Sequence, residues 1–589
     1  MKRRSGNSIG RQRGAALMAL LALVVAGSAF LLVQKLNAAS VKLDRDAETR
    51  KALLQAKQAL LGFAALDNTE GSNMNRPGSL PCPANPLASS SPVNWGIARL
   101  SCAAASARVH RLPWKTLGLS ELRDGTGEYL WYALSPRFRD ATSSVINGDT
   151  RGQINICRGT SAPCPASDVV ANEVVAVIFA PGAPVNTQDR SNATLRDQVV
   201  NYLEDYVLDP NLTYSAVIDQ FKSGPATDTF NDQLITITQE ELMAATENAV
   251  AARLRTLVLP RLRQYYANWG AFPYAAPFDP TTTTVDSRWS PTNQGLLPLA
   301  LDAGDPANPP RVDLRWQNYP FPLMQGALAT GSTCNPDWGD PHQELECQIM
   351  TPASGTLSVS VTAQVRDVGF GLVEPAPNLT NIWPAGAVTS QAFTYNLQAN
   401  GTGVIRVDLT ISAPPSTNVF FELELPKRVS LTGFNYDWLV LNRWYQQILY
   451  AIPPNMTPGG GSTCTTAATA NCLTIQRRNA TSAAASVALV LAGRPALRET
   501  PPSSGCAIQK RPSWDPNPTP GCAEALGPAN YLQNYFESLN NDGVTALPIT
   551  FKEGYRSPSF NDRVVWLSAF NTTPAAGRPN MECAPWLCE

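Results

Sequence analysis

The hydrophobic pattern of the N-terminal part of the chain predicts one long helix with two unlike halves. Residues 14–33 (GAALMALLALVVAGSAFLLV) run for about twenty positions without a charged side chain, which is the length that a helix needs to cross a bilayer. Residues 41–65 are amphipathic instead, with leucine and alanine recurring at helical spacings among good helix formers. Gly62 and Asp67-Asn68 mark the end of this helix. We therefore expect one helix, half in the membrane and half against a globular domain.

Further along the chain the pattern changes to that of strands. The segment EYLWYAL (128–134) is aromatic and β-prone, and it follows the turn signal DGTG (124–127). The continuous apolar run EVVAVIFAPGA (173–183) ends in Pro-Gly and is typical of a buried central strand. Residues 233–238 (QLITIT) alternate, as a half-buried strand does.

A second helix is predicted directly behind the last of these strands, over about 239–267. Thr238, followed by Glu240 and Glu241, has the pattern of a helix N-cap. Pro260 should kink or interrupt the helix. The two acidic residues suit the positive end of the helix dipole, so they need no catalytic explanation.

Residues 354–431 contain runs with a period of two, which predict a β-rich, sandwich-like insert. Asn400-Gly401 is a good hairpin signal within it. The insert would either bind a partner or enlarge the fold, and we favour an interaction surface. Its alternating apolar positions are Leu357, Val359, Val361, Val365, Ile405, Val407, Leu409 and Ile411.

Five sequence landmarks recur in the same order in the two halves of the chain, which predicts an internal repeat. In the first half they are LWY (130–132), Cys157…Cys164, AVIFAPGAP (176–184), NYLEDY (201–206) and FNDQLITI (230–237). In the second half their predicted counterparts are RWY (443–445), Cys464…Cys472, ALVLAGRPA (488–496), NYLQNY (530–535) and FNDRVVWL (560–567). The offsets run from 464 − 157 = 307 to 560 − 230 = 330 residues. Each copy is then one α+β unit, a helix packed on a small antiparallel sheet.

Composition and charge indicate an exported, loop-rich chain. A net charge of −1 gives no electrostatic reason to expect nucleic acid as a partner. Charged residues are scarce at 16%, while 49 prolines and 39 glycines predict many turns and loops. The basic residues near the N-terminus all precede the apolar run, so the positive-inside rule places the N-terminus in the cytoplasm and the bulk of the chain in the periplasm. These residues are Lys2, Arg3, Arg4, Arg11 and Arg13.

The twelve cysteines fall into six local couples, which predicts disulfides that staple loops in an oxidising compartment. Zinc is disfavoured, because no CxxC spacing occurs and the chain has only 2 histidines. The connectivity itself is inferred only from nearness along the sequence. The couples are Cys82 with Cys102, Cys157 with Cys164, Cys334 with Cys347, Cys464 with Cys472, Cys506 with Cys522, and Cys583 with Cys588.

Catalytic motifs are missing from the sequence. No nucleophile elbow, phosphate-binding loop, HExxH or dinucleotide glycine pattern occurs, and any triad would need His110 or His342. His110 is expected to be solvated or satisfied in a core, and the Asn-Asp pair of each FND landmark is expected to form a turn. We predict that the chain is not an enzyme and that it binds no cofactor. Calcium at Asp124, Asp337 or Asp340 stays open, although nothing resembles an EF-hand loop.

A short basic leader ending in Gly14, then an apolar helix that continues into an amphipathic one, resembles the N-terminus of type IV pilins and type II secretion pseudopilins. The segments LPCP (80–83), LPWKTLGL (112–119) and LRDGTGEYLWYALS (122–135) are similar to prepilin-like proteins of Gram-negative bacteria, and the similarity extends to about residue 240. The resemblance implies that prepilin peptidase cuts between Gly14 and Ala15. It also implies that the helix packs with other pilin subunits and that the new N-terminus is methylated.

The chain departs from the family pattern at Ala19, the fifth residue after the implied cut, where the family usually carries glutamate. In the family that carboxylate is thought to pair with the N-terminal amine of a neighbouring subunit inside the membrane, where an unpaired charge is costly. Subunits that lack it tend to be the tip component. The resemblance therefore implies a minor, tip-like subunit.

The expected organisation is a leader (1–14), a transmembrane and amphipathic helix (15–66), a first pilin-like domain (67–238) and a second (239–589) that carries the insert. The expected function is that of a minor, tip-like pilin or pseudopilin of a type IV pilus or type II secretion filament, anchored in the inner membrane. The alternative is a membrane-tethered or secreted binding protein or adhesin outside any filament. A secretory signal peptide cut after Ala38 or Ala39 would fit that alternative.

Overall fold

The computed structural model of the chain describes residues 12–65, 76–87, 91–140, 145–159, 164–208, 219–269, 292–302, 442–457, 464–498 and 531–569, with single strands and short pieces between 272 and 439 and at 508, 509 and 511. The fold is mixed α and β, with few helices and curled sheets. The described helices are α1 (Gln12–Ala65), α2 (Ala105–Arg108), α3 (Ala193–Arg196), α4 (Gln239–Arg253), α5 (Leu259–Trp269) and α7 (Tyr531–Tyr535).

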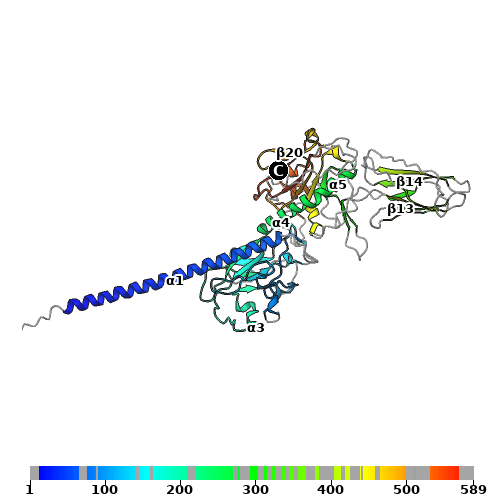
Figure 1. Cartoon of the computed structure of the whole chain (residues 1–589). Helices are drawn as coiled ribbons and strands as arrows, with labels where there is room; N and C mark the ends of the chain where they lie inside the picture. Colours follow the sequence, from blue (N-terminus) through cyan, green and yellow to red (C-terminus); the bar gives the residue numbers. More distant parts are fainter. Residues whose placement is uncertain are drawn as a thin grey trace, which may run out of the picture.

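α1 is one continuous helix over the region where the sequence predicts the long helix. Figure 1 shows its N-terminal half projecting from the globular part, while its C-terminal half lies along that part. Among the residues described, no helix combines the length and the apolar character that a membrane crossing requires. The buried side chains of α1 are small or apolar and share one helical face: Ala52, Leu53, Ala56, Leu60 and Ala64.

The first sheet is built around a long central strand, β4. Its strand order is β1-β2-β4-β3-β6-β5, and β7 pairs with the other edge of β4. β4 contains most of the predicted apolar run, and β7 has the predicted bounds. The strands are β1 (Val109–Arg111), β2 (Trp131–Leu134), β3 (Ile154–Cys157), β4 (Val169–Ala180), β5 (Tyr206–Val207), β6 (Asp219–Lys222) and β7 (Gln233–Thr238).

The second sheet has the order β21-β19-β20-β18-β8, and β22 pairs with β20. Its strands are β8 (Gln294–Leu296), β18 (Ile448–Ala451), β19 (Leu473–Gln476), β20 (Ser482–Leu491), β21 (Thr550–Lys552) and β22 (Arg563–Ser568). We call the first sheet with α1 the first unit, and the second sheet with α4 and α5 the second unit.

The two sheets repeat the same topology. β8, β18, β20, β19, β21 and β22 take the places of β1, β2, β4, β3, β6 and β7, and in each sheet the pair β3–β6 or β19–β21 is parallel while the others are antiparallel. Both central strands also carry an irregularity at the same place, between Val174 and Ala176 and between Ala485 and Val487. This shared irregularity aligns Ala176 with Val487, one residue away from the alignment that the sequence landmarks gave.

Two other predicted correspondences are wrong. Tyr132 faces Ile178 and Tyr450 faces Leu489, so the counterpart of the first LWY landmark lies in β18. Trp444 instead begins a short 3-10 helix (Trp444–Gln447) that precedes this strand. The two cysteine couples are not equivalent either, because one follows the end of β3 and the other precedes β19. In both cases the sequence alignment followed identical residues, whereas the strand register shows which positions of the two sheets are structurally equivalent.

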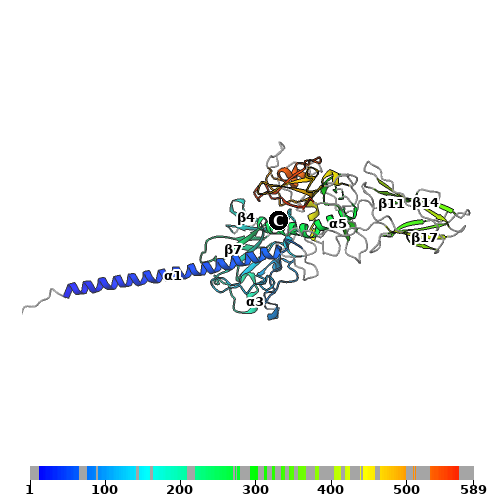
Figure 2. The same ribbon diagram turned by 45° about the horizontal axis from the view of Figure 1, so that its top comes forward.

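α4 follows β7 without a linker. Thr238 Oγ1 accepts a hydrogen bond from the Glu241 backbone N–H, and the Glu241 side chain accepts one from the Thr238 N–H, which confirms the predicted N-cap as a full capping box. The predicted interruption is a π-helical turn, Leu254–Val258, which ends just before Pro260. Figure 2 shows α1 running past β4 and β7, the strands that α4 also contacts.

The β-rich insert forms two further sheets with orders β11-β14-β16 and β12-β13-β17-β15. Leu357, Val359 and Val361 face Ile411, Leu409 and Val407, so the predicted alternating runs pair with each other. The predicted start of the insert is wrong, because β11 to β13 precede residue 354 and pair into the same sheets. β11 and β12 are short and contain a proline, which hid their period. The strands are β11 (Phe321–Met324), β12 (Thr333–Asp337), β13 (Glu344–Met350), β14 (Thr356–Val365), β15 (Leu379–Trp383), β16 (Gly403–Ser412) and β17 (Asn418–Glu424).

A separate hairpin of β9 (Leu299–Asp302) and β10 (Arg311–Leu314) precedes the insert. The predicted hairpin signal Asn400-Gly401 lies outside the described residues.

One apolar core runs through both units. It joins Leu60 of α1, Ile178 of β4 and Val250 of α4 to Trp438 and Leu489 of the second unit, all of them buried. α4 packs against α1 and against both sheets, and it thereby serves as a shared layer. The two units therefore bury their apolar faces against common elements.

Candidate functional site

The projecting half of α1 exposes large apolar side chains. Their exposed fractions run from 58% at Val25 to 73% at Leu23. A contiguous apolar surface of this kind marks a contact site for other proteins or for lipid. Its described members are Met18, Leu20, Leu21, Leu23, Val24 and Val25.

The predicted processing and assembly positions lie on the same helix. Gly14, Ala15 and Ala19 all have helical backbone within α1. Their surroundings lie outside the described residues. The cut after Gly14 and the effect of the missing carboxylate at Ala19 therefore stay predictions.

The DGTG turn holds α1 where the helix reaches the first unit. The Gly125 N–H donates to Thr49 Oγ1 over 2.9 Å, and a Cβ at Gly125 would lie 2.2 Å from the Arg45 carbonyl oxygen. Only glycine permits this approach. Lys57 of α1 pairs with Glu241 of α4 at 2.6 Å, so a capping residue of the second helix also fixes the first.

Asp124 organises this turn and is not a free cation ligand. Its Oδ1 accepts hydrogen bonds from the N–H and hydroxyl of Thr126 and from the Glu128 N–H, at 2.7 to 3.0 Å. Its Oδ2 accepts the Gly182 N–H at 3.0 Å. The described residues hold no group of three or more potential metal ligands. The side chains of the other calcium candidates, Asp337 and Asp340, lie outside the described residues.

An open groove of about 570 Å³ lies between this part of α1 and the ends of β4 and β7. Lys42 and Arg45 line it from the helix, and Thr126, Asn231 and Gln233 line it from the sheet side. Its Asp46 already accepts a hydrogen bond from Gln233 Nε2 at 3.1 Å. Most of the residues that line the groove are polar or charged and the groove is open to solvent, so it lacks the enclosure of a small-molecule site.

A polar network stands at the end of the first sheet. Arg190 Nε donates to the Asn201 carbonyl oxygen at 2.7 Å, and its Nη1 donates to that of Gly182 at 2.8 Å. The Arg190 guanidinium also lies 4.2 Å from the ring centre of Tyr202. Gln188 Oε1 accepts from Arg190 Nη2 at 2.8 Å.

The second sheet carries the same network. Arg511 Nε donates to the Asn534 carbonyl oxygen at 2.9 Å, its Nη1 donates to that of Gly493, and its guanidinium lies 4.7 Å from the ring centre of Tyr535. Gln509 Oε1 accepts from Arg511 Nη2 at 2.9 Å. The repeated signal in the sequence is therefore Gln-x-Arg followed by Asn-Tyr-x-Glu, and its first part is missing from the predicted landmarks.

The registers and contacts also correct the NYLEDY landmark. Its counterpart is NYFESL (534–539), since Glu204 and Glu537 make matching contacts to the two FND segments. The residue after each glutamate has left-handed backbone, with φ of 50° at Asp205 and 56° at Ser538. The predicted NYLQNY match begins four residues too early.

Each FND segment closes its network through a pair of carboxyl groups. Glu204 Oε2 accepts the Asn231 N–H at 3.1 Å, while Asp232 Oδ2 accepts the Glu204 N–H at 3.0 Å. The predicted turn role of the Asn-Asp pair is therefore too narrow. Burial, and then the charge of Glu204, raise the pKa of Asp232 well above its usual range.

The acid that faces the arginine differs between the units. Arg190 pairs with Glu128 of its own unit at 3.1 Å. Arg511 pairs with Asp149, which belongs to the first unit, at 3.3 Å, and both side chains are buried. The second network is thus completed by the first unit, and Asn442 also holds the adjacent loop through Ile146 and Asn147.

His110 is buried on β1 rather than solvated. It stacks near Trp131, with ring centres 5.2 Å apart, and its Nε2 lies 3.4 Å from Asp197 Oδ1. Burial lowers the pKa of His110 to about 4 despite the nearby carboxylate. The ring is therefore neutral, and within the described residues no nucleophile bonds to it. His342 lies outside the described residues.

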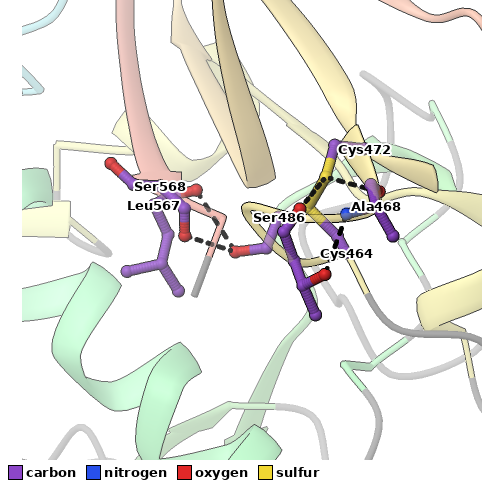
Figure 3. Close-up of a disulfide and its surroundings, with 7 residues drawn as sticks. Cys464, Ala468, Cys472, Ser486, Leu567 and Ser568 are labelled. Carbon is purple, nitrogen blue, oxygen red and sulfur yellow. Dashed lines mark hydrogen bonds between the residues drawn. A yellow bond between two sulfur atoms is a disulfide. The ribbon is translucent and has the colours of Figure 1, made fainter. Parts of the chain in front are cut away.

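Three of the predicted disulfides are confirmed: Cys82–Cys102, Cys157–Cys164 and Cys464–Cys472. The third closes the loop before β19, next to Ser486, whose hydroxyl donates to the Leu567 and Ser568 carbonyl oxygens (Figure 3).

The other three predicted disulfides stay predictions. Cys334 and Cys347 face each other across β12 and β13, but their side chains lie outside the described residues. The couple of Cys506 and Cys522 lies wholly outside the described residues, and so does the couple of Cys583 and Cys588.

Comparisons with protein-family models, with curated proteins and with solved structures find no match to this chain.

Proposed function

We propose that this chain is a minor, tip-like pilin or pseudopilin, a structural subunit of a type IV pilus or type II secretion filament. The observation that carries the proposal is the division of α1. Its C-terminal half packs one face against the globular part, while its N-terminal half projects with exposed apolar side chains. A helix of this kind suits packing beside the helices of other pilin subunits, with its apolar end in the inner membrane.

The arrangement of the second unit supports a position at the tip. α4 packs against the C-terminal half of α1 through Lys57 and Glu241, and the second unit is built onto that helix. A further subunit stacked above this one would clash with the second unit. The proposal also treats both globular parts as two pilin-like heads, each a helix on a sheet of the same topology.

The proposal assigns the chain a structural role and no catalysis. Its partners would be prepilin peptidase, which removes residues 1–14, and other pilin subunits. Most of the chain would lie in the periplasm, an oxidising compartment in which disulfides such as the confirmed ones form and persist.

The deciding experiment is mass spectrometry of the mature N-terminus in cells with and without prepilin peptidase. We expect a peptidase-dependent start at Ala15, lost in Gly14→Leu and kept in the matched leader variant Gly10→Leu. A start near Ala39 or Ser40, or at Met1 or Lys2 regardless of the peptidase, would overturn the proposal. The chain would then be a secreted or tethered binding protein.

A further inference from the structure

The carboxyl pair of the second unit contains one oxygen for which the described residues offer no hydrogen-bond partner. Both oxygens of Glu537 accept hydrogen bonds, Oε1 from Gln509 Nε2 at 2.9 Å and Oε2 from the N–H groups of Asn561 and Asp562 at 3.1 Å. A carboxyl group that accepts at both oxygens is held in its ionised form. Glu537 is therefore the carboxylate of the pair.

Asp562 is bonded on one side only. Its Oδ2 accepts from the Glu537 N–H and from Asn540 Nδ2, each at 2.9 Å. Its Oδ1 is buried and has no hydrogen-bond partner within the described part of the chain. A buried acceptor without a donor is costly, but a proton on that oxygen turns it into a donor toward the neighbouring carboxylate.

The first unit repeats this pattern independently. Glu204 Oε1 accepts from Gln188 Nε2 at 2.5 Å, and Oε2 accepts the Asn231 N–H at 3.1 Å. Asp232 Oδ2 accepts the Glu204 N–H at 3.0 Å, while Asp232 Oδ1 is buried and unbonded among the described residues. The same oxygen is left over in both copies.

We propose that each unit is closed by a carboxyl–carboxylate pair that holds one proton, carried by Asp232 in the first unit and by Asp562 in the second. The proton joins the start of β7 or β22 to the Asn-Tyr-x-Glu segment. The pair acts as a pH-sensitive clasp at the end of each sheet.

The neighbouring cations are engaged elsewhere and do not neutralise the pairs. Arg190 bonds to Glu128 and to backbone carbonyls, and Lys222 pairs with Asp205 at 2.5 Å. In the second unit Arg511 pairs with Asp149, and Lys552 Nζ lies 3.5 Å from Ser538 Oγ. No described lysine or arginine donates to either aspartate.

The sign of the pH effect follows from the direction of the shift. Burial, and then Glu537, raise the pKa of Asp562, and burial and then Glu204 raise that of Asp232, both well above 3.8. A carboxyl group whose pKa is higher in the folded state stabilises the fold at low pH, and that contribution is lost as the pH rises through the raised value. Glu537 is 3% exposed whereas Glu204 is half-buried, so the second clasp should hold its proton to higher pH.

The test compares Asp562→Asn with Glu537→Gln in the full chain in mild detergent, by thermal unfolding from about pH 4, near the pKa of an unfolded aspartate, to about pH 9. Asparagine reproduces the protonated aspartate, so we expect Asp562→Asn to keep the wild-type Tm at the acid end and to exceed it at the alkaline end. Glutamine places an NH₂ against existing donors, so Glu537→Gln should lower the Tm at every pH. Asp232→Asn and Glu204→Gln repeat the comparison in the first unit, with a smaller alkaline gain.

Equal losses for Asp562→Asn and Glu537→Gln at the acid end would overturn the proposal, since both carboxyl groups would then be ionised and needed as acceptors. Infrared spectroscopy of the wild-type chain at neutral pH gives a readout that does not depend on variants. A protonated-carboxyl C=O band that weakens in Asp562→Asn and in Asp232→Asn supports the proposal. A wild-type spectrum without that band would equally overturn it.

Discussion

The first and second units share a topology and a polar network, but they surround it with different chemistry. Arg108 and Asp219 form an ion pair in the first unit with only 1% of each side chain exposed, whereas strand register puts Ile549 in the place of Asp219. His110 faces Tyr132 in the first unit, whereas Gly295 faces Tyr450 in the second. The contacts of the polar network are shared, whereas the residues of this ion pair and the position of His110 differ. The polar network, rather than the composition of each strand, is therefore what the repeat preserves.

The difference also gives the units unequal independence. The first unit supplies its own Glu128 to Arg190, while the second takes Asp149 from the first. Two other pairs stay within the second unit and join it to its own helix α4, Arg494 with Glu240 and Arg556 with Glu247. The second unit thus depends on the first for the carboxylate partner of Arg511, and it shares an apolar core with it.

The largest expected effect comes from breaking the buried pair that only the first unit has. Asp219→Ala should lower the free energy of unfolding by about 3–5 kcal/mol, because it leaves a buried guanidinium without its carboxylate. The double variant Arg108→Met with Asp219→Ile replaces both members of the pair with apolar side chains, as Ile549 does at the second of the two positions, and should recover most of that loss. Denaturant titration of the disulfide-intact chain measures both. If the double variant is as unstable as Asp219→Ala, the loss would come from the missing ion pair and not from the buried guanidinium that Asp219→Ala leaves unpaired.

The next largest effect is expected from removing Asp149, the acid of the first unit that pairs with Arg511 of the second. Asp149→Ala should cost about 2–3 kcal/mol, because a charged hydrogen bond at a buried site is lost. The matched variant Glu128→Ala, whose side chain is 25% exposed, should cost about 1 kcal/mol or less. Hydrogen exchange locates the damage: with Asp149→Ala it should rise around Arg511 in the second unit. Exchange that rises only around residue 149 would mean that the second unit does not depend on this contact.

Acid should weaken the first unit through His110, which has no counterpart in the second. Its pKa, lowered to about 4 by burial, lies below the ordinary 6.5, so the neutral ring stabilises the fold above pH 6.5 and this contribution is lost as the pH falls toward 4. The loss between pH 6.5 and about pH 5 should be about 2 kcal/mol. Denaturant midpoints of the wild type and His110→Gln at both pH values isolate it, since the carboxyl clasps contribute equally to both proteins. The same loss in His110→Gln would assign acid sensitivity to other groups.

The elements that sequence patterns located are those whose signals are local. The buried run of β4, the alternation of β7, the cap at Thr238 and the turn before Pro260 all follow from neighbouring residues. The repeat was visible for the same reason, because FND keeps its letters in both copies. Three local cysteine couples were found as well.

What escaped prediction depends on contacts between distant segments. Asp149 and Arg511 lie 362 positions apart, and no sequence spacing brings them together. The predicted alignment of the central strands was one residue out of register, because matching letters paired Ala176 with Ala488, whereas the bulge that both strands share pairs Ala176 with Val487. The counterpart of the NYLEDY landmark was misplaced because a second Asn-Tyr pair precedes the true one by four residues. The raised pKa of the two aspartates arises from burial, which the letters Asn-Asp do not reveal.

The smallest effect lies at the joint where one unit passes into the other. Thr238 ends β7 and caps α4, so Thr238→Ala should cost about 1 kcal/mol by freeing the Glu241 N–H. Thr236→Ala, on the same strand but outside the cap, serves as the matched control and should cost less. Glu241→Ala removes the reciprocal bond together with the Lys57 ion pair, and it should therefore cost more than Thr238→Ala. Thermal unfolding of the three variants ranks their losses of stability.

Because α4 is packed against both sheets, we expect a single unfolding transition that Thr238→Ala shifts as a whole. Two transitions, of which Thr238→Ala moves only one, would mean that the shared helix does not couple the units.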